Sequence, residues 1–330
     1  MNLSESSDPG ALIIAYRRPE NLQNILEQCV ASGIKRIYIT VDSPRSNTRQ
    51  ELSDVQKVKN VIHVFKSQVS PQIEVHSRAA LRNLGCAVSV LSGCDWAFRR
   101  EKELIVIEDD CIPSKPFFDF AKDQIGNIDL CQSLILVCGT QVAPNSLTGE
   151  SGLLSRYPLT WGWGTNKATW KEIRKLFVDA RLWKIALEDL FALTPETSYW
   201  RAAKRRALVG FTDVWDSVVV EFMQREHLLA ILPPHNLILN NGNDSVATNV
   251  PSDSEWTNKS VASGFIPKKD NLLRRLDVEF WIRKYCYGIS ARHLFSTKLT
   301  FLLDILFIQR RKFRKPLNAR LLEAGPFEKI

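Results

Sequence analysis

The sequence lacks the marks of several common protein classes. Its seven cysteines form no Cys-x-x-Cys pair and no Cys-x-x-His cluster, which argues against a disulfide scaffold and a structural zinc site. No run approaches the roughly 18 apolar residues that a transmembrane helix needs. Residues 1–10 carry two acids and no base, so we expect no secretory signal there. The sequence has no P-loop, GxGxxG, DxDx[TV] or GxSxG motif, which argues against P-loop ATPases, Rossmann dehydrogenases, haloacid-type phosphatases and serine hydrolases.

What is present is the composition of a globular chain. Of its 330 residues, 45% are hydrophobic and 24% are charged. A chain of this length can bury a sizeable core without disulfides or a structural metal. The formal net charge is +8, but residues 268–320 alone hold 14 Lys or Arg against 4 Asp or Glu. Nucleic-acid binding needs cations and aromatics spread over one face. Because the rest of the chain is slightly acidic, we expect no nucleic-acid partner.

Short apolar runs alternate with helical patterns in the first part of the chain. The predicted strands are residues 11–16, 36–41, 61–65 and 103–107, and a later one is 133–138. The predicted helices are 21–31, 48–59 and a segment from Ala80 to Leu91, followed much later by a helical region over 171–209. This alternation predicts an α/β fold with a mostly parallel central sheet flanked by helices. In such sheets, ligands bind beyond the carboxyl ends of the strands.

Three adjacent carboxylates, Glu108-Asp109-Asp110, directly follow the predicted strand 103–107. Carboxylates this close repel one another and lose hydration, so they are costly unless a cation or hydrogen-bond donors neutralise them. Hard oxygen ligands suit Mg²⁺ or Mn²⁺, which keep positions open for phosphate oxygens. The alternative is a solvated acidic turn, but the place at the carboxyl end of a central strand favours a site.

Other polar residues stand where this architecture places a ligand. Tyr16-Arg17-Arg18-Pro19 follows the first strand and offers guanidinium groups suited to bidentate phosphate contact. Asp42 follows the second strand and could accept a hydrogen bond from a base or ribose, while Arg82 and Asn83 precede the acidic triplet. Each of them alone is more often an exposed polar residue; together they describe a nucleotide pocket.

Four segments together resemble the GT-A fold glycosyltransferases. They are Leu-Ile-Ile-Ala-Tyr-Arg-Arg-Pro-Glu-Asn-Leu at 12–22, Asn-Leu-Gly at 83–85, Ile-Val-Ile-Glu-Asp-Asp-Cys-Ile-Pro-Ser at 105–114 and Trp-Gly-Trp-Gly-Thr at 161–165. Over about residues 11–250 the chain is similar to bacterial nucleotide-diphospho-sugar transferases related to the animal N-acetylglucosaminyltransferase I group, whose metal motif is Glu-Asp-Asp. The resemblance implies a GT-A fold, a nucleotide-sugar donor, with a UDP-sugar favoured, and Mn²⁺ or Mg²⁺ as cofactor.

The resemblance also assigns roles to the residues at the strand ends. Asp110, the last acid of the motif, is the expected metal ligand, while Glu108 and Asp109 would contact sugar and ribose. Arg17 is expected near the phosphates, and Asp42 at the base.

The expected catalytic base comes from a later segment. Val214-Trp215-Asp216 resembles the Trp-Asp segment that starts a helix in these enzymes, where inverting relatives place their base. Asp216 is the first candidate and Asp213 the second; the alternative for both is helix N-capping. In an inverting transfer, one carboxylate removes the acceptor hydroxyl proton in a single displacement.

Aromatic and polar residues of the second half complete the expected site. Trp161 and Trp163 flank small glycines, so either indole could stack on an acceptor sugar, and buried packing is the alternative. Residues 240–259 are polar and predict a loop that could act as a lid. Residues 236–248 resemble a family loop that ends in Ala-Thr-His. Because Asn249 stands at the His position, no imidazole role carries over to this chain.

The expected organisation has three parts. Residues 1–125 form the nucleotide-sugar-binding half of the GT-A domain, 126–265 form the acceptor-binding half with the base and the lid loop, and 266–330 form a basic, helical, amphipathic C-terminal extension. In the extension, an aromatic and aliphatic stretch over 281–308 precedes a run of cations at 310–315. Such a segment could lie on an anionic membrane surface or pack on the catalytic domain.

The leading interpretation is a metal-dependent, inverting hexosyl- or N-acetylhexosaminyltransferase. As the resemblance implies, its acceptor would be a glycan or lipid-linked glycan in bacterial cell-surface polysaccharide or lipopolysaccharide synthesis. The expected location is the cytoplasm, with a peripheral place on the inner face of the cytoplasmic membrane left open. The alternative is a non-enzymatic membrane-peripheral or binding protein with a basic tail. A nucleotidylyltransferase would need a glycine-rich loop after the first strand, and residues 16–19 contain no glycine.

Overall fold

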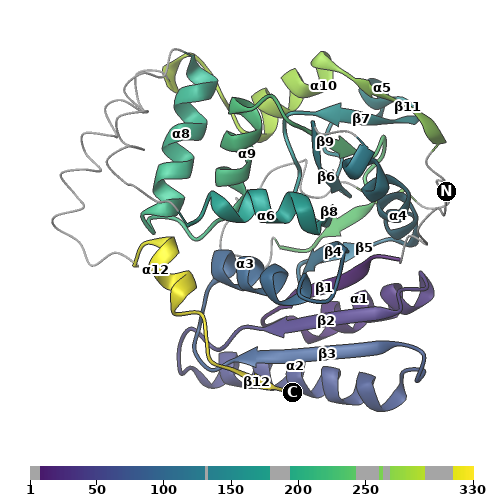
Figure 1. Ribbon diagram of the computed structural model, residues 1–330, viewed down its shortest axis with the longest axis vertical. Helices are drawn as coiled ribbons and strands as arrows, with labels where there is room; N and C mark the ends of the chain where they lie inside the picture. Colours follow the sequence, from purple (N-terminus) through teal and green to yellow (C-terminus); the bar gives the residue numbers. More distant parts are fainter. Residues whose placement is uncertain (1–7, 131–132, 179–193, 243–259, 263–267, 294–314) are drawn as a thin grey trace.

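The first third of the chain builds four parallel strands in the computed structural model (Figure 1). The structure describes residues 8–130, 133–178, 194–242, 260–262, 268–293 and 315–330. The strands are β1 (Gly10–Ala15), β2 (Arg36–Val41), β3 (Glu74–Ala80) and β4 (Glu103–Glu108), joined in turn by α1 (Pro19–Ala31), α2 (Arg49–Gln68) and α3 (Cys86–Ala97). β1 lies between β2 and β4, with Ile13 opposite both Ile39 and Ile107. The carboxyl ends of the four strands therefore meet at one edge.

Later strands extend this sheet on both sides. Among the described residues it has ten strands, in the order β11-β7-β9-β6-β8-β4-β1-β2-β3-β12. The added strands are β6 (Leu134–Cys138), β7 (Ser151–Ser155), β8 (Trp163–Asn166), β9 (Leu229–Leu232), β11 (Lys268–Arg274) and β12 (Phe327–Lys329). β5 (Cys111–Pro113) and β10 (Ile238–Asn240) pair as a separate antiparallel ribbon. The predicted α/β fold with a mostly parallel central sheet flanked by helices is confirmed.

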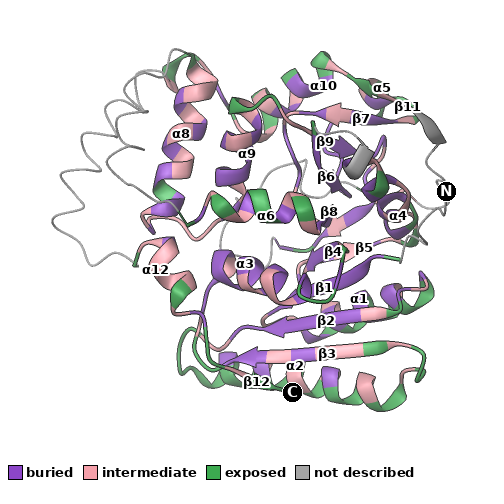
Figure 2. Cartoon of the chain, viewed as in Figure 1, coloured by how far each residue is buried: buried purple, intermediate pink, exposed green. Residues whose placement is uncertain are grey.

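Helices cover both faces of the sheet, and side chains of each strand alternate between them. On β1, Leu12 and Ile14 join one apolar cluster, whereas Ala11, Ile13 and Ala15 join another on the opposite face. The first cluster includes residues of α3, α6 (Lys167–Lys175), α8 (Pro195–Leu208), α9 (Asp216–Arg225) and α12 (Leu317–Leu322); the second includes residues of α1, α2 and α4 (Lys115–Leu130). Figure 2 shows the resulting buried strands inside half-exposed helices.

The third predicted strand is wrong. Residues 61–65 lie in the last turns of α2, and the third strand of the sheet is β3, which starts at Glu74. Val55, Val58 and Ile62 are buried on one face of α2, so the apolar run at 61–65 is the end of a helical stripe. The predicted helix from Ala80 begins only at Cys86, because Ala80 closes β3 and a loop follows.

The C-terminal region contributes strands to both edges of the sheet. β11 pairs with β7 at one edge, and β12 pairs with β3 at the other. Short helices lie between them, namely α10 (Leu276–Trp281), the π-helical turn η1 (Ile282–Cys286) and α12, while α5 (Asn145–Thr148) precedes β7. The predicted apolar helix over 281–308 falls mostly outside the described residues, and the three-part division of the chain stays a prediction. No helix in the described ranges is long and apolar enough to cross a membrane.

Candidate active site

A cavity of about 180 Å³ opens where the parallel strands end. β1 is followed by Tyr16, β2 by Asp42, and β4 ends at Glu108 itself, so the edge predicted from the sequence is where these side chains meet. The predicted site residues that line the cavity are Tyr16, Asp42, Glu108, Asp109, Asp110, Trp161 and Asp216. Arg17, Arg82, Asn83, Trp163 and Asp213 lie outside its lining.

Asp109 is buried and fastens the turn after β1 to the end of β4. Its Oδ2 accepts the backbone N–H groups of Tyr16 at 2.6 Å and Arg17 at 3.1 Å, and its Oδ1 lies 3.1 Å from Nη1 of Arg18. Asn21 donates to its backbone carbonyl. Burial raises the pKa of Asp109 to about 6, although the charge of Arg18 opposes that rise. Its carboxylate therefore already has donors within the chain.

Glu108 and Asp110 flank Asp109 and line the cavity. Burial raises the pKa of Glu108 to about 8, with the negative charges of Asp110 and Asp216 adding to the effect. Within the described ranges, no Lys or Arg forms an ion pair with Glu108, Asp110 or Asp216, whereas Asp109 pairs with Arg18. The thiol of Cys86 is 3.6 Å from Oε2 of Glu108. The carboxylates of Glu108, Asp110 and Asp216 therefore share one cavity without a paired Lys or Arg in the part of the chain that the structure describes.

A second segment passes close over Asp110. The backbone carbonyl of Asp110 accepts the N–H of Asn241 at 2.7 Å, and the Cys111 thiol lies 3.1 Å from Oδ1 of Asp110. A Cβ at Gly242 would come within 2.9 Å of Oδ2 of Asp110, so only glycine fits there without displacing a neighbour. The ribbon of β5 and β10 thus sets the position of the expected metal ligand.

Asp42 holds the loop that leads from β3 to α3. Its two oxygens accept the N–H groups of Ser43, Leu84 and Gly85 at 2.7 to 2.8 Å and the side-chain amide of Asn83 at 3.1 Å. Burial raises the pKa of Asp42, and these backbone donors counter it. With four donors in place, Asp42 shapes the pocket, and its contact with a base stays a prediction. Asn83 serves the same loop.

The two remaining predicted arginines face other partners. Arg17 makes an ion pair with Asp54 of α2, at 2.9 Å between Nη2 and Oδ2. Arg82 has a half-exposed side chain that lies 3.7 Å from Glu323 near the C-terminus. Neither guanidinium is placed on the cavity, so their predicted phosphate contacts have no support in this geometry.

Two other cations, Arg18 and Arg45, line the cavity instead, and of these only Arg45 had no role predicted from the sequence. Arg18 belongs to the quoted motif, and Arg45 follows Asp42 in the next loop. That loop is fixed by Glu51, which accepts the N–H groups of Arg45 at 3.0 Å and Ser46 at 2.7 Å and the hydroxyl of Tyr16. A Ser-Pro-Arg turn directly after a strand-end acid was the available signal for Arg45.

The hydrogen bonds around Glu51 shift the pKa values of both partners. Burial acts to raise the pKa of Glu51, but hydrogen bonds from Ser46 and Tyr16 outweigh it and lower that pKa to about 2. Burial, together with the bond to Glu51, raises the pKa of Tyr16 to about 12. Glu51 is therefore an ionised acceptor at neutral pH, which keeps the loop after β2 in place.

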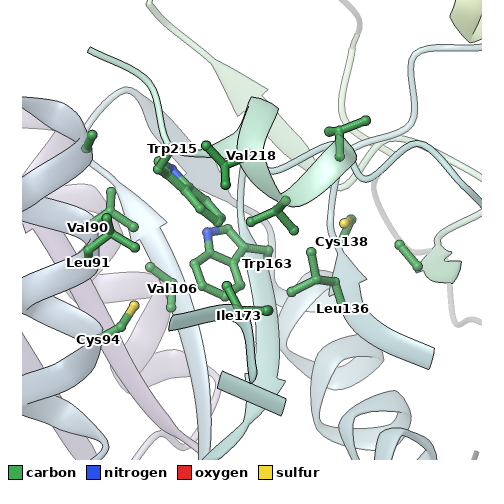
Figure 3. Close-up of a cluster of buried hydrophobic side chains, with 14 of the residues drawn as sticks. Val90, Leu91, Cys94, Val106, Leu136, Cys138, Trp163, Ile173, Trp215 and Val218 are labelled. Carbon is green, nitrogen blue, oxygen red and sulfur yellow. The ribbon is translucent and has the colours of Figure 1, made fainter. Parts of the chain in front are cut away.

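The structure places the two tryptophans of the predicted acceptor site in different environments. Trp161 is half-buried and lines the cavity. Trp163 is fully buried and packs against Trp170 and Trp215, with ring centroids 6.1 Å and 4.9 Å apart (Figure 3). Trp161 precedes β8, whereas Trp163 is its first residue, and the backbone turns between them at Gly162, whose φ is +68°. The two side chains therefore do not share one face, which explains the difference from the sequence expectation. We keep Trp161 as an acceptor candidate and assign Trp163 to the core.

The two candidate bases also differ. Asp216 is the first residue of α9, is half-buried and lines the cavity, and burial raises its pKa. Asp213 faces away from the cavity lining: its Oδ1 is 2.9 Å from Nη2 of Arg320 and its Oδ2 accepts the N–H of Cys86 at 3.1 Å. The predicted lid over 240–259 and Asn249 lie largely or wholly outside the described residues.

Comparison with known proteins gives a distant likeness. No protein-family model and no curated protein matches the sequence. Among solved structures, the chain is similar to a crystal structure of UDP-glucose pyrophosphorylase complexed with UDP-glucose, with a TM-score of 0.35 and 8% identity, over 69% of this chain and 90% of that chain. The function is therefore argued from the side chains of the cavity.

Proposed function

We propose that this protein is a metal-dependent, inverting glycosyltransferase. It would move a sugar from a nucleoside-diphosphate donor, a UDP-sugar by preference, to a glycan or glycolipid acceptor of the bacterial cell surface. The observation that carries the proposal is one cavity at the carboxyl ends of parallel strands that holds both acids and cations: Glu108, Asp110 and Asp216 with Arg18 and Arg45. Acids alone would repel a diphosphate, whereas acids with a bound cation beside two guanidinium groups suit it.

The carboxylates present fit a hard divalent cation. Burial, and after it the charges of Asp110 and Asp216, raise the pKa of Glu108, and a bound cation would oppose both effects. Mg²⁺ and Mn²⁺ are commonly held by one or two carboxylates plus phosphate oxygens. The described residues contain no set of three His, Cys, Asp or Glu arranged as a metal shell, so donor oxygens would have to complete the ligands. Asp110, assisted by Glu108, would hold the ion, which would stabilise charge on the departing nucleoside diphosphate.

The cations of the cavity would hold the donor. Arg18 and Arg45 come from the loops after β1 and β2, so they reach the cavity from two adjacent strand ends. Guanidinium groups bind phosphate oxygens through paired, charge-assisted hydrogen bonds. Because Arg18 already pairs with Asp109, its position is fixed before a ligand arrives, which lowers the entropy cost of binding.

Asp216 would act as the base in the displacement at the anomeric carbon. Its carboxylate would remove the proton from the acceptor hydroxyl as that oxygen forms the new glycosidic bond and the nucleoside diphosphate departs. A pKa raised by burial makes Asp216 a stronger base than an exposed carboxylate. Asp213 is less suited because Arg320 neutralises it. Trp161 would offer a flat surface for the acceptor sugar.

Calorimetry with nucleoside diphosphates tests the proposal. UDP, GDP, ADP and CDP are titrated into the protein with Mn²⁺ and with EDTA, and we expect tight binding of one of them only with metal. Asp110→Asn should abolish that metal dependence, whereas Asp119→Asn, an exposed change on α4 that pairs with Lys115, should not. Release of the nucleoside diphosphate from the matching nucleotide sugar then reports turnover. No binding of any diphosphate by the wild-type protein with Mn²⁺ would contradict the proposal.

A further inference from the structure

We propose that Arg320, near the C-terminal end of the chain, is a positioning residue of the candidate active site. It fastens the loop after β3 to the segment before α9 and so sets the cavity wall that faces the donor. The inference deepens the proposed function and rests on it for the nature of the ligand, but its geometry belongs to the chain alone. It gives the C-terminal segment a role beyond basic charge.

One guanidinium group joins two loops that are far apart in the sequence. Nη2 of Arg320 lies 2.9 Å from Oδ1 of Asp213 and 2.5 Å from the backbone carbonyl of Leu84. The other oxygen of Asp213 accepts the N–H of Cys86 at 3.1 Å. The side chains of Arg320 and Asp213 are only 13% and 12% exposed, so the pair is largely shielded from water and salt.

The loop in question carries part of the cavity wall. Gly85 and Cys86 line the cavity, and the same loop is held from the other side by Asp42, which accepts the N–H groups of Leu84 and Gly85. Gly85 has a φ of +78°, and a Cβ there would lie 2.1 Å from Oδ2 of Asp213. The carboxylate therefore packs directly against glycine backbone, and the wall has little room to shift while Arg320 holds Asp213.

The segment that carries Arg320 is itself docked on both sides of this loop. Leu317 of α12 is fully buried, and α12 lies beside α3 (Figure 1). Further along, β12 pairs with β3, placing Phe327 opposite Ala80, and the carbonyl of Pro326 accepts the N–H of Leu81. The chain from Leu317 to Lys329 thus contacts the loop where it leaves β3 and again where it enters α3.

Charge explains why this contact matters to a donor as well as to stability. Without Arg320, the carboxylate of Asp213 would lose this guanidinium partner while staying in a poorly solvated place, three residues before Asp216. Its charge already acts on Asp42 and Cys86 at the cavity wall. Loss of the positive charge of Arg320 would leave this wall more negative, and a more negative wall would repel a diphosphate. Loss of Arg320 should therefore weaken binding through charge as well as through loop movement.

The test compares Arg320→Ala with Lys315→Ala, which removes an exposed ion pair with Glu323 in the same segment. We expect Arg320→Ala to weaken Mn²⁺-dependent binding of the nucleoside diphosphate about tenfold or more, as loss of a hydrogen-bonded charge pair typically does. Lys315→Ala should stay within about twofold of wild type. In hydrogen exchange, the Cys86 amide should lose protection in Arg320→Ala and keep it in Lys315→Ala.

A double substitution separates the effect of charge from that of loop position. In Arg320→Ala with Asp213→Asn, the carboxylate that lost Arg320 is also neutralised, so the affinity for the diphosphate and the melting temperature should both recover in part, whereas the Cys86 amide should stay less protected than in the wild type. Arg320→Lys, which keeps the charge but has a shorter side chain that reaches less far toward Leu84 and Asp213, should give an intermediate affinity. If Arg320→Ala fails to fold, Arg320→Lys supplies both measurements.

Each failure has its own signature. If the wild-type protein binds no diphosphate, the proposed function falls, and exchange at Cys86 still tests the contact. If the wild-type protein binds and Arg320→Ala binds equally well with an unchanged Cys86 amide, Arg320 has no positioning role. Reduced affinity in Arg320→Ala with an unchanged Cys86 amide likewise overturns the proposal, because the loop would not have moved.

Discussion

Oδ2 of Asp109 accepts the backbone N–H of Tyr16 at 2.6 Å, and this bond distinguishes Asp109 from the other two acids of the triplet. Glu108 ends β4, and Asp109 and Asp110 form the turn that follows. All three line the cavity, but the carboxylate of Asp109 is already bonded to the turn after β1 and to Arg18. Asp109 fixes the end of β4 to the turn after β1. The two flanking acids line the cavity with no Lys or Arg of the described residues paired to them. The triplet is therefore one structural acid between two that are suited to a cation.

Asp109→Asn and Asp110→Asn should therefore have opposite effects. The first loses the ion pair with Arg18 and weakens the bonds to the Tyr16 and Arg17 amides, so we expect a loss of about 2 to 4 kcal/mol in the free energy of unfolding. The second should leave stability unchanged or raise it slightly, because it removes a repelling charge, while metal-dependent binding disappears. Urea unfolding, with and without Mn²⁺, measures both. Equal destabilisation by the two changes would contradict the division.

Gly242→Ala should impair metal-dependent nucleotide binding. The new methyl group would lie 2.9 Å from Oδ2 of Asp110 and 2.8 Å from Oδ1 of Asn240, so one of these side chains must move. Gly126→Ala on α4 is the matched control, because its Cβ meets nothing within 4 Å. It should stabilise the protein by about 0.5 to 1 kcal/mol without changing affinity. Calorimetry with Mn²⁺ and the best nucleoside diphosphate decides the first point, and thermal unfolding the second. Unchanged affinity in Gly242→Ala would speak against Asp110 as the ligand.

Asp216→Asn should stop transfer while leaving donor binding nearly intact. The amide keeps the size of the carboxylate but cannot take the acceptor proton, so kcat should fall about 10²- to 10⁴-fold. Asp213→Asn should act mainly through Arg320 and raise KM more than it lowers kcat. Steady-state kinetics and donor affinity measured on the same preparations distinguish these patterns. Transfer by Asp216→Asn at the wild-type rate would place the base elsewhere.

Glu51 should make stability depend on pH in the acid range. Its folded pKa of about 2 lies below its ordinary value of 4.5, so it contributes stability above pH 4.5 that is lost as the pH falls toward 2. The shift corresponds to at most about 3 kcal/mol. The difference in unfolding free energy between wild type and Glu51→Gln should be constant from about pH 8 to 5.5 and shrink below pH 4.5. Glu20→Gln, at an exposed position on α1, should show a small difference throughout. A difference for Glu51→Gln that does not vary with pH would count against this assignment.

Local patterns predicted the strands that hold the site because those strands are buried on both faces. β1, β2 and β4 are six residues long with largely apolar, buried interiors. The cavity residues Tyr16 and Asp42 directly follow β1 and β2, and β4 ends at Glu108. β3 was missed because Glu74, His76 and Arg78 interrupt it; it lies toward one side of the sheet and is covered at its outer edge only by β12. The apolar stretch at 61–65 looked like a strand because periodicity over five residues hardly separates a helix from a strand.

The site itself was predictable only where it follows directly from strand ends. Glu108, Asp110 and Asp42 follow this rule, and Asp216 came from the resemblance of its segment. The contacts of Arg320 could not be inferred, because its partner Leu84 is 236 positions away in the sequence and no local pattern links the two. Arg17 was a reasonable phosphate ligand by residue type, but its side chain forms an ion pair with Asp54. Trp163 was a reasonable sugar-stacking residue, but its ring packs against Trp215 in the core. Neither contact can be inferred from a local pattern.

The cluster of tryptophans at the cavity gives the protein an intrinsic spectroscopic signal for ligand binding. Trp161 and Trp215 line the cavity, and Trp215 shares its ring contact with Trp163 in the interior. A nucleotide that enters should change the emission of the two lining rings, and the tight pair should give a near-ultraviolet dichroism band that disappears when packing loosens. Ligand occupancy and core integrity can thus be followed separately in one unlabelled sample.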